Sequence, residues 1–477
     1  MTGPTSPAAV DGRPLDRSTA AGPAAPVRMV HLGLGSFFRA HQAWYTAHAP
    51  DAADWGFAAF TGRSAALSTV LAGQNGLYTL LTKAADGDSV EVLASISRTH
   101  PGADTAALLG YLADPAVTVM TLTVTEAGYR LGADGRLDLS DPDVIADLDT
   151  VRDILRRKPS DVARSAPALR TVPARVAAGL LVRRAAGAGP LSVVSCDNLP
   201  HNGRITAQVV TDFALQVDAA APEWISGNIG FVTTMVDRIT PTTAPADMHS
   251  AAQLSGYADQ APVVTEPFSE WVLSGTFTAA RPDWAAAGAA FVPDIAPFEQ
   301  RKLWILNGGH SLLAYLGGAR GHTTIADTMD DQWCRRWLTT WWDEATDHLD
   351  LPRPDVLAYR DAVLTRFTNP AIRHLLSQIG TDGSQKLPIR ILPVLRRRRA
   401  NGELPPAAVL AIAGWIHHVR DSGSAVKDVA AGRLQQAALG PVEMATAALL
   451  RVLDENLAGD TELVAAIVQA VGTLADR

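Results

Sequence analysis

Cysteine is scarce in this chain, and long apolar runs are missing. Only Cys196 and Cys334 occur among the 477 residues, in unrelated contexts. Two isolated cysteines build neither a disulfide framework nor a zinc-binding spacing, a pattern typical of reducing compartments. No uncharged apolar run reaches the 18 or so residues that a membrane-spanning helix needs. We therefore expect a cytoplasmic protein with no membrane partner.

Positive charge is not in excess either. The chain has 41 Lys and Arg against 49 Asp and Glu, a net charge of −8, which gives it no electrostatic reason to bind nucleic acid. The one dense basic run, residues 396–399, is interpreted as a solvated turn, with an anion-binding patch as the alternative. The sequence does not indicate protein partners.

The chain is long enough for two domains, because one hydrophobic core stops growing at about 250–300 residues. Residues 1–27, rich in Pro, Ala and Gly, lack the features of a signal peptide and are predicted to be a disordered tail. Strands alternate with helices over residues 28–284, which predicts a doubly wound parallel sheet. Helical periodicity dominates residues 285–477. The predicted fold class is α/β: a Rossmann-like N-terminal domain with a predominantly α-helical C-terminal domain.

A glycine-containing segment, "HLGLGSFFRAH", follows the first predicted strand. Gly33 and Gly35 would allow a tight turn and let the backbone approach a pyrophosphate, as in dinucleotide-binding folds. The third glycine of that fingerprint is replaced by Phe38. We assign Gly33, Gly35, Phe38 and Arg39 to a cofactor site, with an ordinary strand-to-helix turn as the alternative.

The second predicted strand ends in "FTGRSA", without the carboxylate that reads the adenosine ribose of NAD. Arg63 is included in the cofactor site, either as a contact to the 2′-phosphate of NADP or as a surface charge. The cofactor is therefore NAD or NADP, and the preference stays open.

The segment "KLWILNGGH", residues 302–310, mixes polar groups into an apolar helix. On an ideal α-helix at about 100° per residue, Lys302, Glu299, Asn307 and His310 fall within about 140° of one another. This favours a polar cluster facing a pocket, where Gly308–Gly309 leave room for a ligand. The alternative is a lysine that reaches solvent and a core histidine.

A desolvated lysine can serve as the base or acid of a hydride transfer from a carbinol, because burial lowers its pKa from about 10.4. Asn307 would donate to the developing alkoxide, and His310 would orient a hydroxyl. Such an arrangement needs no metal, and no clear zinc-ligand spacing is present.

Seven segments in order, "HLGLGSFFRAHQ", "TVTEAGY", "SCDNLPHNG", "FVTTMVDRITP", "EPFSEWVL", "KLWILNGGHS" and "DGSQKLPIR", resemble the mannitol dehydrogenase family of long-chain polyol-specific dehydrogenases. That family includes mannitol 2-dehydrogenases and fructuronate reductases (D-mannonate oxidoreductases). The resemblance implies metal-independent hydride transfer with NAD(P). It implies that Lys302 is the general acid/base, that Asn307 and Asn198 polarise the reacting oxygen, and that His310 positions it.

The same resemblance implies further roles. Asp237 would line the substrate site, and Glu299 would lie on the proton path to Lys302. Lys386 and Arg390 are candidate contacts for a hexonate carboxylate, which suits a charge-assisted hydrogen bond. "QIGTDGSQKLPIR" resembles the fructuronate reductase branch, in which Gln378 stands where a mannitol 2-dehydrogenase tends to have arginine.

We therefore expect a dehydrogenase for a sugar acid or polyol, favouring D-mannonate/D-fructuronate over D-mannitol/D-fructose. A dinucleotide sensor without turnover is the alternative from a different class. A third is a helical interaction protein, because "WCRRWLTTWWDEA" holds four tryptophans; we expect these to pack a core instead. They are Trp333, Trp337, Trp341 and Trp342.

Overall fold

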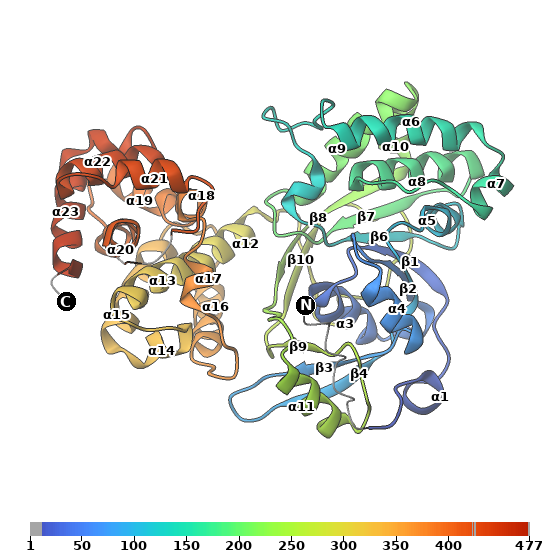
Figure 1. The fold of residues 1–477 in the computed structure, drawn as a ribbon, viewed down its shortest axis with the longest axis horizontal. Helices are drawn as coiled ribbons and strands as arrows, with labels where there is room; N and C mark the ends of the chain where they lie inside the picture. Colours follow the sequence, from blue (N-terminus) through green and yellow to red (C-terminus); the bar gives the residue numbers. More distant parts are fainter. Residues whose placement is uncertain (1–11, 422, 424–425, 476–477) are drawn as a thin grey trace, which may run out of the picture. The chain divides into compact units, whose positions relative to one another are not determined.

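The structure is a computed structural model that describes residues 12–421, 423 and 426–475 (Figure 1). It divides into two compact units, Met1–Ile295 and Ala296–Arg477. The first is built around a mostly parallel sheet, and the second is helical. The predicted fold class is confirmed.

An eight-stranded sheet organises the first unit. Its strands are β1 (Val27–Leu32), β2 (Gly56–Phe60), β5 (Ile96–His100), β6 (Val119–Leu122), β7 (Leu191–Ser195), β8 (Ile229–Asp237), β10 (Glu270–Ser274) and β11 (Ala290–Phe291). Their order is β11-β10-β8-β7-β6-β1-β2-β5. Every pair from β8 to β5 is parallel, whereas β10 runs antiparallel to β8. The strand order reverses beside β1, so ligands are expected at the carboxyl end of this strand.

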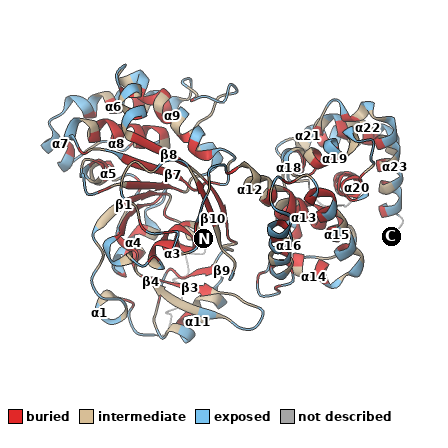
Figure 2. Cartoon of the chain, turned by 180° about the vertical axis from the view of Figure 1, so that it is seen from behind, coloured by how far each residue is buried: buried red, intermediate tan, exposed pale blue. Residues whose placement is uncertain are grey.

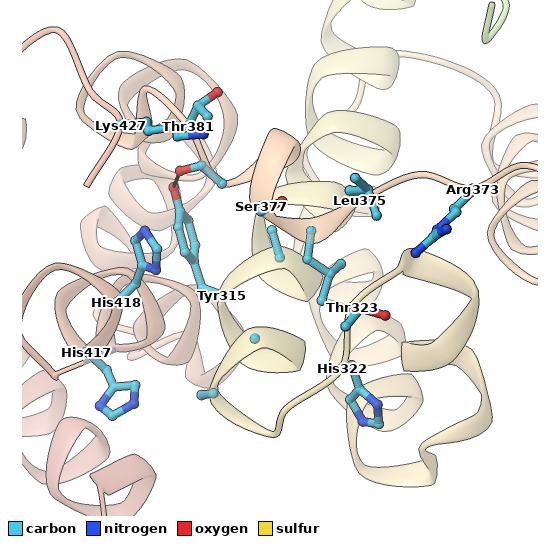
Figure 3. A pocket seen from close by; sticks show the side chains of 15 residues that line it. Tyr315, His322, Thr323, Arg373, Leu375, Ser377, Thr381, His417, His418 and Lys427 are labelled. Carbon is cyan, nitrogen blue, oxygen red and sulfur yellow. Dashed lines mark hydrogen bonds between the residues drawn. The ribbon is translucent and has the colours of Figure 1, made fainter. Parts of the chain in front are cut away.

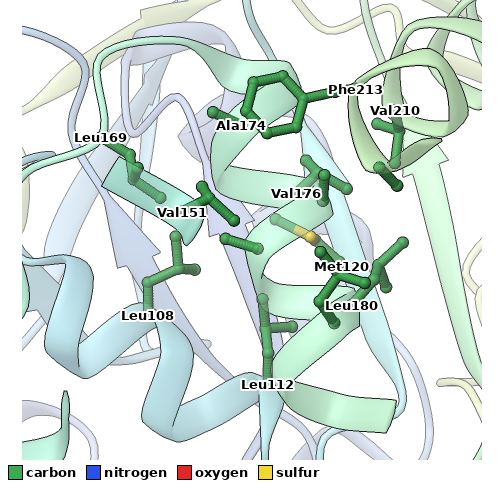
Figure 4. Close-up of a cluster of buried hydrophobic side chains, with 14 of the residues drawn as sticks. Leu108, Leu112, Met120, Val151, Leu169, Ala174, Val176, Leu180, Val210 and Phe213 are labelled. Atoms are coloured by element: carbon green, nitrogen blue, oxygen red, sulfur yellow. The ribbon is translucent and has the colours of Figure 1, made fainter. Parts of the chain in front are cut away.

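Helices cover both faces of this sheet (Figure 1). One face carries α5 (Thr105–Leu112), α6 (Pro142–Arg156), α7 (Pro159–Arg164), α8 (Val172–Ala186), α9 (Asn202–Val217) and α10 (Ala221–Asn228). Their apolar side chains form a core around Met120 and Phe213 (Figure 4). A Cβ on Gly179 would lie 2.1 Å from Leu112, so this glycine lets α8 pack closely on α5.

The other face holds short helices and a small sheet. The helices are α2 (Ser36–Ala40), α3 (Gln42–Ala47), α4 (Ala66–Gly73) and α11 (Pro245–Ser255), with the 3₁₀ turns η1 (Ala52–Asp54) and η2 (Glu126–Tyr129) elsewhere in the unit. The small sheet joins β4 (Ser89–Leu93), β3 (Tyr78–Thr82) and β9 (Val263–Thr265). Trp271 and Trp284 are fully buried in the core beneath them.

The predicted disordered tail, residues 1–27, lies partly outside the described residues. Its described part contains α1 (Arg17–Ala20), capped by the side chain of Asp16. The Arg17 guanidinium donates to the carbonyls of Ala94 and Ile96, at 2.8 Å each. The described part of this segment is therefore ordered against the first unit.

The second unit is a helical assembly in which α13 and α20 are the most deeply buried elements (Figure 2). Its described residues form no strand beyond an isolated bridge. The elements are α12 (Ala296–Arg301), the π-helix η3 (Lys302–Gly308), α13 (Gly309–Ala319), α14 (Ile325–Asp330), α15 (Gln332–Thr346), α16 (Arg353–Phe367), α17 (Leu376–Ile379), α18 (Gly383–Arg390), α19 (Leu392–Ala400), α20 (Pro406–Asp421), α21 (Ala431–Ala437), α22 (Val442–Leu453), η4 (Leu457–Gly459) and α23 (Thr461–Ala475).

The arginine run at 396–399 is helical, and the expectation of a solvated turn is wrong. It forms the end of α19, and its side chains meet carboxylates. Arg398 pairs with Asp347 and Glu403 at 2.7 Å each, and Arg399 pairs with Asp460 at 2.8 Å. These ion pairs offset much of the positive charge of the run and attach α19 to its neighbours.

No helix in the described ranges is both long enough and apolar enough to cross a membrane.

Candidate active site

The glycine segment after β1 forms a tight loop at the carboxyl end of the strand. Gly33 has φ of 111°, and a Cβ there would lie 1.9 Å from the carbonyl oxygen of Thr123. The amides of Gly33 and Leu34 donate to the carbonyl of Phe60 at 3.0 and 2.9 Å. Only glycine fits this position. Bare backbone at the switch point of the sheet suits the pyrophosphate of a dinucleotide.

A neutral histidine supports the loop from below. The ring nitrogens of His31 lie 2.8 Å from the Thr121 hydroxyl and 3.0 Å from the Thr123 hydroxyl. Burial lowers the pKa of His31 to about 3, so the ring stays uncharged. Phe38 stacks on it with 3.5 Å between ring centroids and is completely buried. The Phe38 side chain therefore fills the core, which corrects its assignment as a cofactor contact.

Arg39 is also a structural residue. Its guanidinium donates to the carbonyls of Ala261 and, at 3.2 Å, Gly35, and lies over the ring of Tyr78. With 4% of its surface exposed, it holds the loop and does not face a ligand. Arg63, in contrast, is exposed in the turn after β2.

The parallel strands bring two more predicted residues to the same edge. Asn198 follows β7 and is exposed, and Asp237 ends β8 and is buried. Because β1, β6, β7 and β8 are parallel neighbours, their carboxyl ends share the edge that carries Gly33. The structure thus places Gly33, Asn198 and Asp237 along one rim of the first unit.

A buried carboxyl group that the sequence reasoning missed lies next to Asn198. Asp197 accepts hydrogen bonds from the amide of Val124 and the hydroxyl of Tyr129. Burial raises its pKa to about 7. Asn202 completes the support, because its side chain donates to the carbonyls of Asp197 and Thr234 at 2.9 and 2.8 Å. The motifs "TVTEAGY" and "SCDNLPHNG" contained these residues, but spacing alone did not show that they meet.

In the second unit, Lys302 begins η3, a π-helical turn that runs to Gly308. The expectation of a regular α-helix is wrong here. Hydrogen bonds in a π-helix join residue i to residue i+5, so Lys302 and Asn307 lie across one turn from each other. His310 follows one α-helical turn later in α13. Glu299 precedes them in α12 and, like Lys302, is partly buried.

The sequence suggested that the two glycines after Asn307 leave room for a ligand. The structure shows that they do not. A Cβ on Gly308 would lie 2.8 Å from the Trp341 indole, and one on Gly309 would lie 2.9 Å from Leu338. The space beside them is filled by α15. Trp341 and Trp342 are buried, which confirms the prediction of core packing for these two tryptophans.

His310 is buried and uncharged. It stacks on Phe367 with 4.5 Å between ring centroids and meets the His374 ring edge-on. Burial, with His374 and two arginines nearby, holds its pKa well below 6.5. Its Nε2 has no hydrogen-bond partner among the described residues. A neutral imidazole with a spare nitrogen suits contact with a substrate hydroxyl.

Arg390 and Lys386 lie one turn apart on α18. The Arg390 guanidinium donates to the Ser311 hydroxyl at 3.1 Å and to the Asn307 carbonyl at 3.5 Å. Burial lowers its pKa to about 10. Lys386 donates to the Ile379 carbonyl at 3.1 Å, and burial together with Arg390 lowers its pKa. The structure therefore joins Arg390 to the Asn307 turn, whereas Gln378 is exposed.

A cavity of about 700 Å³ lies within the helical unit (Figure 3). It is lined by Tyr315, Arg373, His417, His418 and Lys427 among others, but by none of the predicted catalytic residues. Because no predicted catalytic residue lines this cavity, we do not assign it to the catalytic site.

A second group of side chains is a poor candidate for a metal site. Ligand atoms of His322, Asp331 and Cys334 lie within 4.8 Å of one another. However, Arg320 already donates a hydrogen bond to the Asp331 carboxylate at 2.5 Å. Burial also raises the pKa of Cys334 to about 12. A protonated thiol and a carboxylate already paired with arginine bind metal ions weakly.

A glycine turn at the switch point, next to polar residues at neighbouring strand ends, is the arrangement of a dinucleotide-binding, Rossmann-type fold. The chain belongs to the mannitol dehydrogenase family: residues 27–286 match the mannitol dehydrogenase Rossmann domain, and residues 294–475 match the mannitol dehydrogenase C-terminal domain. Its members are oxidoreductases that act on polyols and sugar acids.

Individual relatives are similar over most of their length. D-mannonate oxidoreductase of Escherichia coli strain K12 is 36% identical, covering 84% of this chain and 82% of the relative. D-arabinitol 4-dehydrogenase of Ralstonia nicotianae is 38% identical, covering 81% of each. The solved structure of Pseudomonas fluorescens mannitol 2-dehydrogenase with NAD and D-mannitol superposes with a TM-score of 0.78 at 32% identity, covering 98% of this chain and 94% of that one.

Proposed function

We propose that this chain is a fructuronate reductase, which interconverts D-mannonate and D-fructuronate with NAD(P). The observation that carries the proposal is the state of Arg390. The side chain is partly exposed, but its Nε is buried and has no acceptor, and no carboxylate lies within 4 Å of the guanidinium among the described residues. A partly desolvated cation without an anion is unfavourable, and a substrate carboxylate would supply the missing partner.

Lys386 strengthens this interpretation. It is the second cation on α18, and the positive charge of Arg390 contributes to its lowered pKa. A hexonate carboxylate would offset both charges, whereas an uncharged polyol would offset neither. The similarity to D-mannonate oxidoreductase agrees with this substrate class.

Hydride transfer itself is the chemistry that the nicotinamide supplies when it is bound. In the direction of oxidation, Lys302 would take the proton of the carbinol hydroxyl. Asn307 would donate a hydrogen bond to the oxygen as negative charge develops on it. The family resemblance implies the same role for Asn198. Neutral His310 would orient the same group. Glu299, three residues before Lys302, would pass the proton to solvent, and Asp237 would accept from a further substrate hydroxyl.

The polyol alternative is D-mannitol/D-fructose or a related alditol. It is favoured by the mannitol 2-dehydrogenase structure, which matches nearly the whole chain. A dinucleotide sensor without turnover is the remaining alternative. It gives no reason for the chain to hold Lys302 and Asn307 across one turn.

Initial rates of reduction distinguish these functions. D-fructuronate and D-fructose are each tested with NADH and NADPH, using wild type, Arg390→Met and, as a control, Arg353→Met in the exposed first turn of α16. We expect kcat/KM for fructuronate to exceed that for fructose at least tenfold. Arg390→Met should lower the fructuronate value about 100-fold, the loss typical of removing one partner of a buried charge pair.

The effect on fructose should stay within threefold. Preference for fructose, or equal losses on both substrates, contradicts the sugar-acid assignment. Absence of turnover with sugar acids and polyols alike would favour the sensor.

A further inference from the structure

Two tryptophan side chains of α15 hold the turn that carries the predicted catalytic lysine. The indole nitrogen of Trp341 donates to the carbonyl of Trp304 at 2.8 Å. The indole nitrogen of Trp342 donates to the carbonyl of Ile305 at 2.9 Å. Both carbonyls belong to the π-helical turn η3, and both bonds are buried. Two consecutive tryptophans of α15 thus donate hydrogen bonds to two consecutive carbonyls of the η3 turn.

Gly308 and Gly309 make these two hydrogen bonds possible. The nearest atoms to a Cβ on Gly308 would be Nε1 and Cζ2 of Trp341, each at 2.8 Å, which is closer than real Cβ atoms approach their neighbours. A Cβ on Gly309 would lie 3.4 Å from Nε1 of Trp342. The indole rings can reach the backbone only where side chains are missing. This gives the glycine pair of "KLWILNGGH" a structural reason.

The π-helical turn matters for the chemistry because it sets which residues share a side. On a regular α-helix, Lys302 and Asn307 would be about 140° apart. The i to i+5 bonding of a π-helix places them one above the other instead. An α-helix is the default conformation, since π-helices account for well under 1% of residues in globular proteins. Something outside the turn must therefore favour the wider form.

We propose that Trp341 and Trp342 are positioning residues that keep the η3 turn π-helical and so hold Lys302 beside Asn307. The proposal rests on the proposed function, in which Lys302 transfers the proton. Neither tryptophan contacts substrate; each acts through the backbone of the turn.

Trp337 on the same helix provides a matched control. Its indole nitrogen is buried but has no acceptor among the described residues. Replacing Trp337 by Phe therefore removes an indole from α15 without removing a bond to the turn. If the three tryptophans only filled space in the core, Trp337→Phe, Trp341→Phe and Trp342→Phe would have similar effects.

The test compares Trp341→Phe, Trp342→Phe and Trp337→Phe by kinetics and by hydrogen–deuterium exchange. We expect kcat to fall at least tenfold in the first two variants, because small misplacements of a catalytic group are costly. The pH profile of kcat/KM should also shift in Trp341→Phe and Trp342→Phe. The dissociation constant for NADH should stay within twofold. Amides in peptides covering residues 302–310 should exchange at least tenfold faster, while Trp337→Phe resembles wild type in each measurement.

A glycine pair tests the same idea without touching a tryptophan. Gly308→Ala should push the Trp341 indole away and lower kcat as Trp341→Phe does. Gly318→Ala, in the following helix α13 with open space around its Cβ, should leave kcat unchanged.

The possible failures are distinguishable. Unchanged exchange over residues 302–310 in both tryptophan variants overturns the positioning role, whatever the substrate is. Faster exchange with unchanged kcat and pH profile overturns it as well. If wild type reduces only a polyol, the same kinetics are run on that polyol, and only the sugar-acid assignment fails. If Lys302→Ala keeps its rate, both the catalytic assignment and the positioning proposal fail.

Discussion

The hydroxyl of Tyr129 donates a hydrogen bond to the buried carboxyl group of Asp197. Tyr129 ends the turn η2 after β6, and Asp197 follows β7, so the bond ties together two adjacent strand ends. Asn198, the predicted oxygen-polarising residue, is the next residue along the chain. Asn198 therefore directly follows a carboxyl group whose pKa burial raises to about 7.

This carboxyl group gives a prediction about stability and pH. Its pKa is raised from 3.8 to about 7, chiefly by burial. The folded state then binds the proton more tightly than the unfolded state, so the group's contribution to the free energy of unfolding falls as pH rises from about 4 to about 7. The limiting slope is about 1.4 kcal/mol per pH unit.

Asp197→Asn mimics the protonated form and removes this dependence. We expect the free energy of unfolding of the variant, minus that of wild type, to grow across pH 4–7 and to level off above it. Urea denaturation at five pH values measures this difference. Taking the difference cancels the opposing contributions of buried histidines such as His31 and His374. A pH-independent difference would contradict the raised pKa.

Lys302→Ala should abolish turnover while sparing coenzyme binding. General acid–base catalysis contributes about 10²–10⁴-fold, and kcat should fall by that factor. Binding of NADH, followed by fluorescence titration, should change less than twofold. Lys158→Ala, at the exposed start of α7, is the control for loss of a lysine. Normal turnover by Lys302→Ala would remove this residue from the mechanism.

Gly62→Asp should make the protein selective for NAD(H). The turn after β2 offers no carboxylate to the adenosine ribose, and a side chain on Gly62 would meet open space. The new carboxylate should bind the 2′-hydroxyl and repel a 2′-phosphate. We expect kcat/KM to fall at least tenfold with NADPH and less than threefold with NADH. Gly73→Asp, an exposed glycine of α4 with equal space, controls for added charge.

Arg63→Ala separates the two roles left open for this residue. A loss confined to NADPH assigns the guanidinium to the 2′-phosphate. Equal rates with both coenzymes make it a surface charge.

We expect Arg390 to lower the stability of the free protein and to stabilise the complex with a sugar acid. Removing a partly desolvated cation that lacks an anion is expected to be neutral or stabilising, so Arg390→Met should keep or raise Tm. D-mannonate should raise Tm of wild type, because a ligand that binds only the folded state stabilises it. It should not raise Tm of the variant. Thermal unfolding with and without D-mannonate checks both, and a lower Tm of the free variant would identify Arg390 as structural.

The sheet and its glycine loop were predictable because their signals are local. A short apolar strand running into Gly33, followed by strands and helices of regular length, has few alternatives. The same local motif led to the wrong assignment of Phe38 and Arg39 to the cofactor site. Only their contacts with His31 and Ala261 show that both side chains face the core.

The helical unit was less predictable, because its decisive contacts are distant in sequence. The π-helix was missed since helical periodicity assumes 3.6 residues per turn, and its cause lies in Trp341 and Trp342, more than 30 residues away. The arginine run was interpreted from its charge alone. Its helix became visible only with partners such as Asp460, which follows about 60 residues later.

The wider turn also constrains the length of the chain. A hydrogen bond from residue i to i+5 encloses one residue more than the α-helical bond, so η3 behaves as a one-residue insertion in a continuous helix. Deleting one residue between Lys302 and Asn307 would remove this insertion and let the segment return to α-helical hydrogen bonding. The Lys302 and Asn307 side chains would then lie four residues apart, about 40° from each other on an α-helix, and would still share a side.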